Sequence, residues 1–221
     1  MSRADIASRI EYTNLKPDTT EEGIVDLCRD ASEHGFHAVC VNPCRVHIAV
    51  SALRGTPIHV CSVVGFPLGA NASKLKAAEA AGAITDGARE IDMVMNIGWF
   101  KEGNRKLTEQ DIRTVRAAVG DGTVLKVIIE AAVLSDPEKA DAARLVIQAG
   151  GNFVKTSTGF HPAGGATVED VKLLKSVVGS HAKIKAAAGI RDAKTVIQMI
   201  EAGADRIGTS AAVAIIGEIP Q

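Results

Sequence analysis

Short apolar runs alternate along the chain with longer segments of helical character, and this alternation limits the possible folds more than any other feature. The runs are rich in β-branched residues, which favours buried strands. Repeated strand–helix units imply parallel strands, and eight of them favour a closed (β/α)8 barrel over an open sheet. The predicted strands are residues 10–15, 38–42, 59–66, 90–96, 124–130, 152–157, 183–188 and 206–208.

The boundaries between these units carry helix start and stop patterns. Residues 19–22, 135–138 and 167–170 have the composition of capping boxes, and Gly87, Gly150 and Gly203 lie at helix-to-strand turns. For the first strand, residues 10–15 also fit a helix end, which is the alternative to a strand there. No Pro/Ser-rich linker and no strand leading into G-x-G-x-x-G interrupts the pattern. We therefore expect one barrel domain over residues 1–221.

Composition excludes several classes of protein. With 221 residues, 46% of them hydrophobic, the chain can bury a large core, and its net charge of −1 argues against nucleic-acid binding. No signal-peptide core and no apolar stretch long enough to span a bilayer is present. Four cysteines then predict free thiols in a cytoplasmic protein. Cys40, Cys44 and His47 lack a nearby fourth ligand for structural zinc, so we expect no metal.

Charged residues occur on strands where a barrel interior is normally apolar. Because side chains alternate between the two faces of a strand, the charged set must point toward the barrel axis when the other set is apolar. This places Asp92, Lys126, Glu130, Lys155 and Lys185 inside the barrel. Any one of them could belong to an ion network that only fixes strand order, but the whole set is unusual for a barrel core.

The functional interpretation of these residues is imine chemistry. A lysine amine is a nucleophile only when neutral, and desolvation or a neighbouring cation favours that form. Lys155 and Lys185 lie on consecutive predicted strands, so each can act on the other. Asp92 adds a carboxylate that can pass protons, directly or through water. The prediction is a Schiff-base enzyme with Lys155 as nucleophile.

Three glycine-containing turns predict an anion site beside Lys155. Barrels often bind phosphate at the loops after strands seven and eight, where backbone N–H groups are free. Ordinary tight turns are the alternative for any one of them, but three on adjacent strands favour a phosphate cradle. The candidate residues are Thr158, Gly159, Gly189, Ile190, Arg191, Gly208 and Ser210, and a secondary pocket beside them is expected to involve Lys126, Cys40, Thr13 and Lys16, with Cys40 near the pocket mouth.

Several sequence motifs resemble those of the deoxyribose-phosphate aldolase family over nearly the whole chain. They are EYTNLKP at 11–17, VCVNP at 39–43, VGFPLG at 64–69, EIDMV at 90–94, KVIIE at 126–130, FVKTSTGF at 153–160 and RIGTS at 206–210. The KTSTG run and the order of the motifs are highly specific.

This resemblance implies reversible cleavage of 2-deoxy-D-ribose 5-phosphate to D-glyceraldehyde 3-phosphate and acetaldehyde. It implies that Lys155 forms the Schiff base, that Lys185 lowers its pKa and that Asp92 relays protons. It implies no metal or organic cofactor, and a homodimer or larger assembly. Two departures affect the phosphate site: Ala188 stands where the family usually has Gly, and Ala211 where it often has Ser. If position 188 requires positive φ, its methyl group costs about 1 kcal/mol or more, and we expect weakened phosphate affinity.

Three other functions remain open from sequence alone. Another class I aldolase or a transaldolase-like barrel would use the same lysine on a different sugar phosphate. A catalytically silent barrel would bind a phosphorylated metabolite or a protein partner, although the intact lysines and Asp92 argue against it. Metal-dependent aldol chemistry would need a histidine cluster that the sequence does not suggest.

Overall fold

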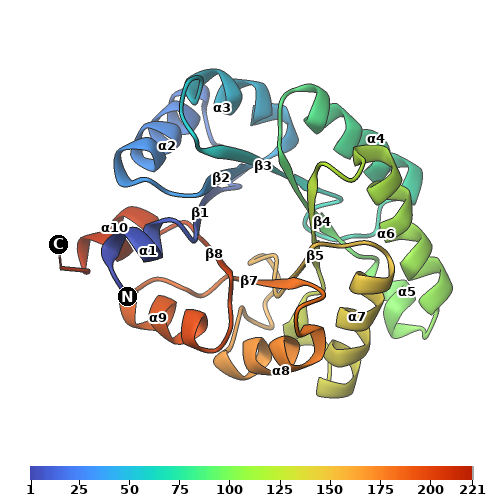
Figure 1. Cartoon of the computed structure of the whole chain (residues 1–221). Coiled ribbons are helices and arrows are strands. Elements are labelled where there is room, and N and C mark those ends of the chain that lie inside the picture. The colour runs from blue at the N-terminus through green and yellow to red at the C-terminus, as the bar shows by residue number, and fades with distance from the viewer. Residues whose placement is uncertain (221) are drawn as a thin grey trace.

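A computed structural model describes residues 1–220 as one closed eight-stranded barrel surrounded by helices (Figure 1). The strands follow one another around the barrel in sequence order, and each pairs in parallel with its neighbours, including β8 with β1. The predicted (β/α)8 fold is confirmed. Within residues 1–220, no helix combines the length and hydrophobicity needed to cross a bilayer.

All eight predicted strands form, including the first, for which a helix end was the alternative. Several end earlier than predicted, because their last residues turn into the loops at the carboxyl end of the barrel. The strands are β1 Ile10–Asn14, β2 Ala38–Val41, β3 His59–Val64, β4 Glu90–Val94, β5 Val124–Ile128, β6 Phe153–Lys155, β7 Lys183–Ala187 and β8 Arg206–Thr209.

The helices cover the outside of the barrel (Figure 1). Glu138 accepts from the Ser135 backbone N–H in the predicted capping box, whereas Thr20 and Thr167 cap their helices without a reciprocal bond. The α-helices are α1 Arg3–Ala7, α2 Glu21–His34, α3 Val46–Ala52, α4 Ser73–Thr85, α5 Ile97–Lys101, α6 Arg105–Val119, α7 Asp136–Gln148, α8 Val168–Val178, α9 Ala193–Glu201 and α10 Ala212–Gly217; η1 Pro43–Arg45 and η2 Ala131–Val133 are short 3-10 turns.

The main core lies between the barrel and the helices. On β4, Ile91 and Met93 are fully buried in this layer, whereas Asp92 between them belongs to the other face. A much smaller apolar cluster, which includes Cys40 and Cys61, lies apart from it. The strand alternation therefore leaves room inside the barrel for charged side chains, as the sequence indicates.

Candidate active site

A cavity of about 460 Å³ opens at the carboxyl ends of the strands. Active sites of (β/α)8 enzymes lie at this end, because the loops that follow the strands meet there. The loops after β1, β6, β7 and β8 supply most of the lining. Of the residues predicted from the sequence, the cavity is lined by Lys155, Thr158, Gly159, Gly189, Ile190, Arg191, Gly208, Ser210, Thr13 and Lys16.

Lys155 ends β6 and brings an amine to the floor of the cavity. The residue is only 3% exposed, and its Nζ lies 2.7 Å from Oδ2 of Asp92. Lys185 is the register partner of Lys155 on β7, and its Nζ lies 2.6 Å from the same oxygen. The predicted proximity of the three residues is therefore confirmed, with one carboxylate oxygen shared by two amines.

Asp92 lies beneath the cavity and is fully buried. Burial alone would raise the pKa of its carboxyl group, but the ammonium groups of Lys126, Lys155 and Lys185 outweigh burial and hold that pKa well below its usual range. Lys126 reaches the other carboxylate oxygen, with its Nζ 3.1 Å from Oδ1. Asp92 is thus an anion that accepts from three amines.

Lys185 has a second partner that the sequence argument missed. Its Nζ lies 2.5 Å from Oε2 of Glu11, a fully buried residue on β1. Burial lowers the pKa of Lys185, but the charges of Asp92 and Glu11 outweigh burial and raise that pKa above its ordinary value. Lys185 is therefore a fixed cation in the barrel. Applying the face alternation to β1 would have found Glu11, since it is the one charged residue on that strand.

Glu90 is a second acid of the barrel interior that was not predicted from the sequence. It begins β4, two residues before Asp92, and its Oε2 lies 2.5 Å from Nζ of Lys126. With Glu11 and Asp92 it brings the interior carboxylates to three, facing the ammonium groups of Lys126, Lys155 and Lys185. The opposite charges are equal in number, so each buried ion has a partner.

Two residues of the predicted secondary pocket lie elsewhere. Cys40 is fully buried beside Asp92, with its Sγ 4.0 Å from Oδ2, and is therefore not at the pocket mouth. Lys126 is also fully buried and belongs to the ion cluster below the cavity. Both point inward from the middle of their strands, so neither reaches the loops that line the cavity.

Glu130 is buried, as expected, but it does not join the ion cluster. β5 ends at Ile128, and Glu130 has left-handed backbone torsions with a φ of 50°. Its carboxylate accepts from Thr158, at 3.1 Å from the backbone N–H and 2.5 Å from Oγ1. Strand alternation does not extend into this turn, where Glu130 instead fixes the loop after β6.

The loops after β7 and β8, which the sequence predicts as an anion site, line the cavity together with Lys155. Ala188 has a φ of 72°, which confirms that this position requires the left-handed conformation. Its backbone lies so close to Gly165 that a side chain on that glycine would meet the Ala188 carbonyl oxygen. Thr209 Oγ1 donates to the Ile190 carbonyl at 2.7 Å, which ties the loops after β7 and β8 together.

This arrangement combines two chemical capabilities. At one end, a desolvated amine contacts an ionised carboxylate beside fixed cations, which suits addition of the amine to a carbonyl followed by proton transfer. At the other end, glycine turns, the Ser210 hydroxyl and the Arg191 guanidinium are suited to an anion. A small compound with a carbonyl and a phosphate would engage both ends.

Comparison with known proteins agrees with this geometry. The DeoC/LacD aldolase family profile matches residues 11–217. A deoxyribose-phosphate aldolase of Aciduliprofundum boonei is 55% identical, covering 98% of this chain and 97% of its own length. A deoxyribose-phosphate aldolase from Desulfitobacterium hafniense is 48% identical, covering 98% of this chain and 99% of its own length. The structure of the tetrameric deoxyribose phosphate aldolase from Aeropyrum pernix superposes with a TM-score of 0.91 at 33% identity, covering 98% of this chain and 91% of that chain. The chain belongs to the DeoC/LacD family of aldolases.

Proposed function

We propose that this aldolase cleaves 2-deoxy-D-ribose 5-phosphate reversibly to D-glyceraldehyde 3-phosphate and acetaldehyde, through a Schiff base on Lys155. The observation that carries the proposal is the position of Lys155, which lines the cavity while its Nζ lies 2.7 Å from Asp92. The relatives named as deoxyribose-phosphate aldolases support the choice of substrate.

The reaction begins when neutral Lys155 Nζ adds to C1 of the open-chain sugar. Asp92 is the nearest base, and it accepts the proton that the ammonium must lose. Loss of water from the carbinolamine gives the iminium ion. Lys185 remains charged and contacts the same carboxylate oxygen as Lys155.

Carbon–carbon cleavage then uses the iminium as the electron sink. Asp92, which lies beneath the cavity, takes up the proton of the C3 hydroxyl through water, and the C2–C3 bond breaks to release glyceraldehyde 3-phosphate. The electron pair forms an enamine on Lys155. Protonation of its carbon and hydrolysis of the imine release acetaldehyde and restore the amine. No atom or electron is needed beyond substrate and water.

The phosphate is held at the opposite side of the cavity. We place it against the loops of Gly189, Gly208 and Ser210, with Thr158 and Gly159 closing the third side and Arg191 supplying charge. Glu130 supports this side indirectly, because it fixes Thr158 through two hydrogen bonds. The distance between anion site and amine would then select the length of the sugar phosphate.

The proposal is tested by steady-state turnover. Release of glyceraldehyde 3-phosphate from 2-deoxyribose 5-phosphate is followed with a coupled dehydrogenase, for the wild type and for Lys155→Met. The expected result is turnover by the wild type and loss of roughly 10⁴-fold or more in the variant, which lacks the nucleophile. Turnover of a different sugar phosphate instead would keep the reaction class and reject the substrate. Equal activity of the variant would reject Lys155.

We also propose that the protein works in the cytoplasm as a homodimer or larger assembly. The free thiols of Cys28, Cys40, Cys44 and Cys61 support a reducing compartment. The tetrameric relative from Aeropyrum pernix supports self-association. Light scattering coupled to size-exclusion chromatography tests this: a mass well above 23.0 kDa is expected, and a monomeric mass would contradict it.

A further inference from the structure

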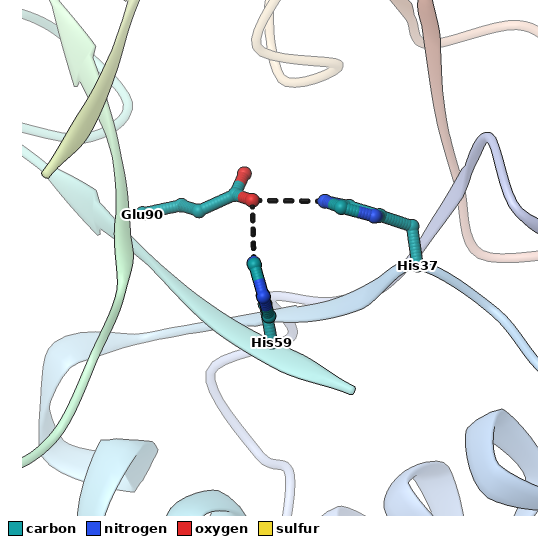
Figure 2. Close-up of side chains that lie close together, drawn as sticks. All are labelled: His37, His59 and Glu90. Atoms are coloured by element: carbon teal, nitrogen blue, oxygen red, sulfur yellow. Dashed lines mark hydrogen bonds and ion pairs between the residues drawn. The ribbon is translucent and has the colours of Figure 1, made fainter. Parts of the chain in front are cut away.

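A second polar cluster lies at the opposite end of the barrel from the cavity. Figure 2 shows His37 and His59 both directed at one carboxylate oxygen of Glu90. His37 Nε2 lies 2.9 Å and His59 Nδ1 lies 3.0 Å from Glu90 Oε1. His59 and Glu90 begin β3 and β4, and His37 precedes β2, so the cluster forms the amino-terminal floor of the barrel.

The spacing of these three side chains would also suit a divalent metal ion, but their neighbours disfavour one. Lys126 Nζ lies 2.5 Å from the other oxygen of Glu90, and an Arg206 NH2 group lies 3.0 Å from His37 Nε2. A metal ion would be placed beside two fixed positive charges. The cluster is better explained as a set of donors that orient a single carboxylate.

Lys126 connects this floor to the active site. Glu90 and Asp92 point the same way from β4, and Lys126 is the register partner of Asp92 on β5. Its Nζ lies 2.5 Å from Glu90, 3.1 Å from Asp92 and 3.3 Å from Glu11. Asp92 then contacts Lys155 through its second oxygen. An unbroken series of polar contacts thus links the partly exposed histidines to the proposed nucleophile.

We infer that Glu90, held in place by His37 and His59, is a positioning residue of the aldolase centre. Its carboxylate neutralises Lys126 from the amino-terminal end of the barrel, so that Asp92 keeps its contact with Lys155. The inference rests on the proposed function. Glu90 is 2% exposed, whereas the His37 and His59 side chains are 20% and 32% exposed. The histidines therefore separate a buried carboxylate from solvent and fix which way it faces.

The balance of charge explains why the loss of Glu90 would reach Lys155. Without that carboxylate, the three ammonium groups would face only Glu11 and Asp92, which leaves one buried positive charge uncompensated. Lys155 lines the cavity and can release its proton to solvent. Lys126, having lost Glu90 as a partner, would attract Asp92 toward the amino-terminal end of the barrel and away from Lys155. The titratable or charged groups facing this centre from the surrounding strands are Glu11, Cys40, Cys61, Glu90, Lys126 and Lys185.

The test compares Glu90→Gln with the wild type in two assays. The first is the pH dependence of reductive ethylation of Lys155 by acetaldehyde and cyanoborohydride, measured by peptide mapping. The second is turnover of 2-deoxyribose 5-phosphate. We expect the labelling midpoint to move to lower pH by about one unit, because a buried negative charge is lost. We expect kcat to fall about tenfold with KM within about twofold, the scale seen when an active-site group loses an outer partner.

A matched control and a milder variant keep the test decisive. Lys183→Gln removes an exposed charge from the same end of the barrel. Its labelling midpoint, kcat and KM should equal those of the wild type. If circular dichroism shows that Glu90→Gln is unfolded, Glu90→Asp keeps the charge but withdraws it from Lys126, and a smaller shift in the same direction is expected.

Different failures remain distinguishable. A folded Glu90→Gln protein with the labelling midpoint and kcat of the wild type would overturn the inference alone, as would an equal shift in Lys183→Gln. A wild type that labels at Lys155 but does not cleave the sugar phosphate would reject the proposed function, while the labelling midpoint would still decide the role of Glu90. No labelling of Lys155 at any pH would reject both.

Discussion

Replacing Ala188 with glycine should improve both stability and phosphate binding. Ala188 has a φ of 72°, and an L-residue pays about 1–2 kcal/mol for that conformation. Glycine avoids this strain but adds freedom to the unfolded chain, worth about 0.4–1 kcal/mol. Subtracting the two ranges leaves a net gain in the free energy of unfolding of about 0–1.6 kcal/mol, with a midpoint of ~0.8 kcal/mol. For a chain of this size, the midpoint corresponds to a rise in Tm of roughly 2–3 °C.

The same substitution removes a methyl group from the anion side of the cavity. Ala188 lines the cavity, where it lies against the loop between β6 and α8 that contains Gly159 and Gly165. We expect the KM for 2-deoxyribose 5-phosphate to fall about two- to fivefold, since about 1 kcal/mol corresponds to fivefold. The KM for unphosphorylated 2-deoxyribose should be unchanged. Steady-state kinetics with both substrates measures the difference.

The control is Ala187→Gly, one residue earlier within β7. Glycine in a regular strand costs about 0.5–1 kcal/mol relative to alanine, so Tm should fall. Comparable KM values for the phosphorylated sugar in wild type and Ala188→Gly, or a lower Tm in Ala188→Gly, would refute the reasoning about position 188.

Three further predictions follow from buried polar contacts. Glu130→Gln replaces the carboxylate that accepts from Thr158, so KM for the phosphorylated sugar should rise several-fold while Lys155 still labels. Lys76→Met leaves the fully buried Asp111 unpaired and should cost about 3–5 kcal/mol in urea unfolding, with little change in KM. The folded-state pKa of Asp92 is depressed, so its stabilising contribution is present above about pH 4 and lost as pH falls further. Asp92→Asn should therefore flatten the acid side of the stability–pH curve; an unchanged curve would contradict this.

The fold was predictable from sequence because strand alternation and helix periodicity are local patterns. Every predicted strand is present, and the errors are at the ends. Asn96, for example, was predicted within a strand but instead caps α5, with its side chain accepting from the Trp99 backbone N–H. This cap joins residues only three positions apart, and asparagine is a preferred N-cap residue, so the strand end was a local signal that the strand prediction overran.

The candidate site was predictable where a charge breaks an apolar strand. Lys155 and Lys185 are brought together as expected because they are register partners on adjacent strands, and Asp92 meets both from β4 because all three side chains point into the barrel. Glu11 and Glu90 were missed, although the same alternation applies to β1 and to the first residue of β4. The depth of Cys40 was not predictable, since the level of a residue along the barrel axis depends on strand stagger as well as on its face.

The central claim is that Lys155 forms an imine with the substrate carbonyl. Incubation with acetaldehyde, reduction with borohydride and peptide mapping by mass spectrometry test it directly. The account predicts one added ethyl group on Lys155, a mass increase of about 28 Da, because imine formation loses water and reduction adds two hydrogens. No ethyl group is expected at this position in Lys155→Met. Modification of Lys185 in place of Lys155, or no adduct in folded protein, would contradict it.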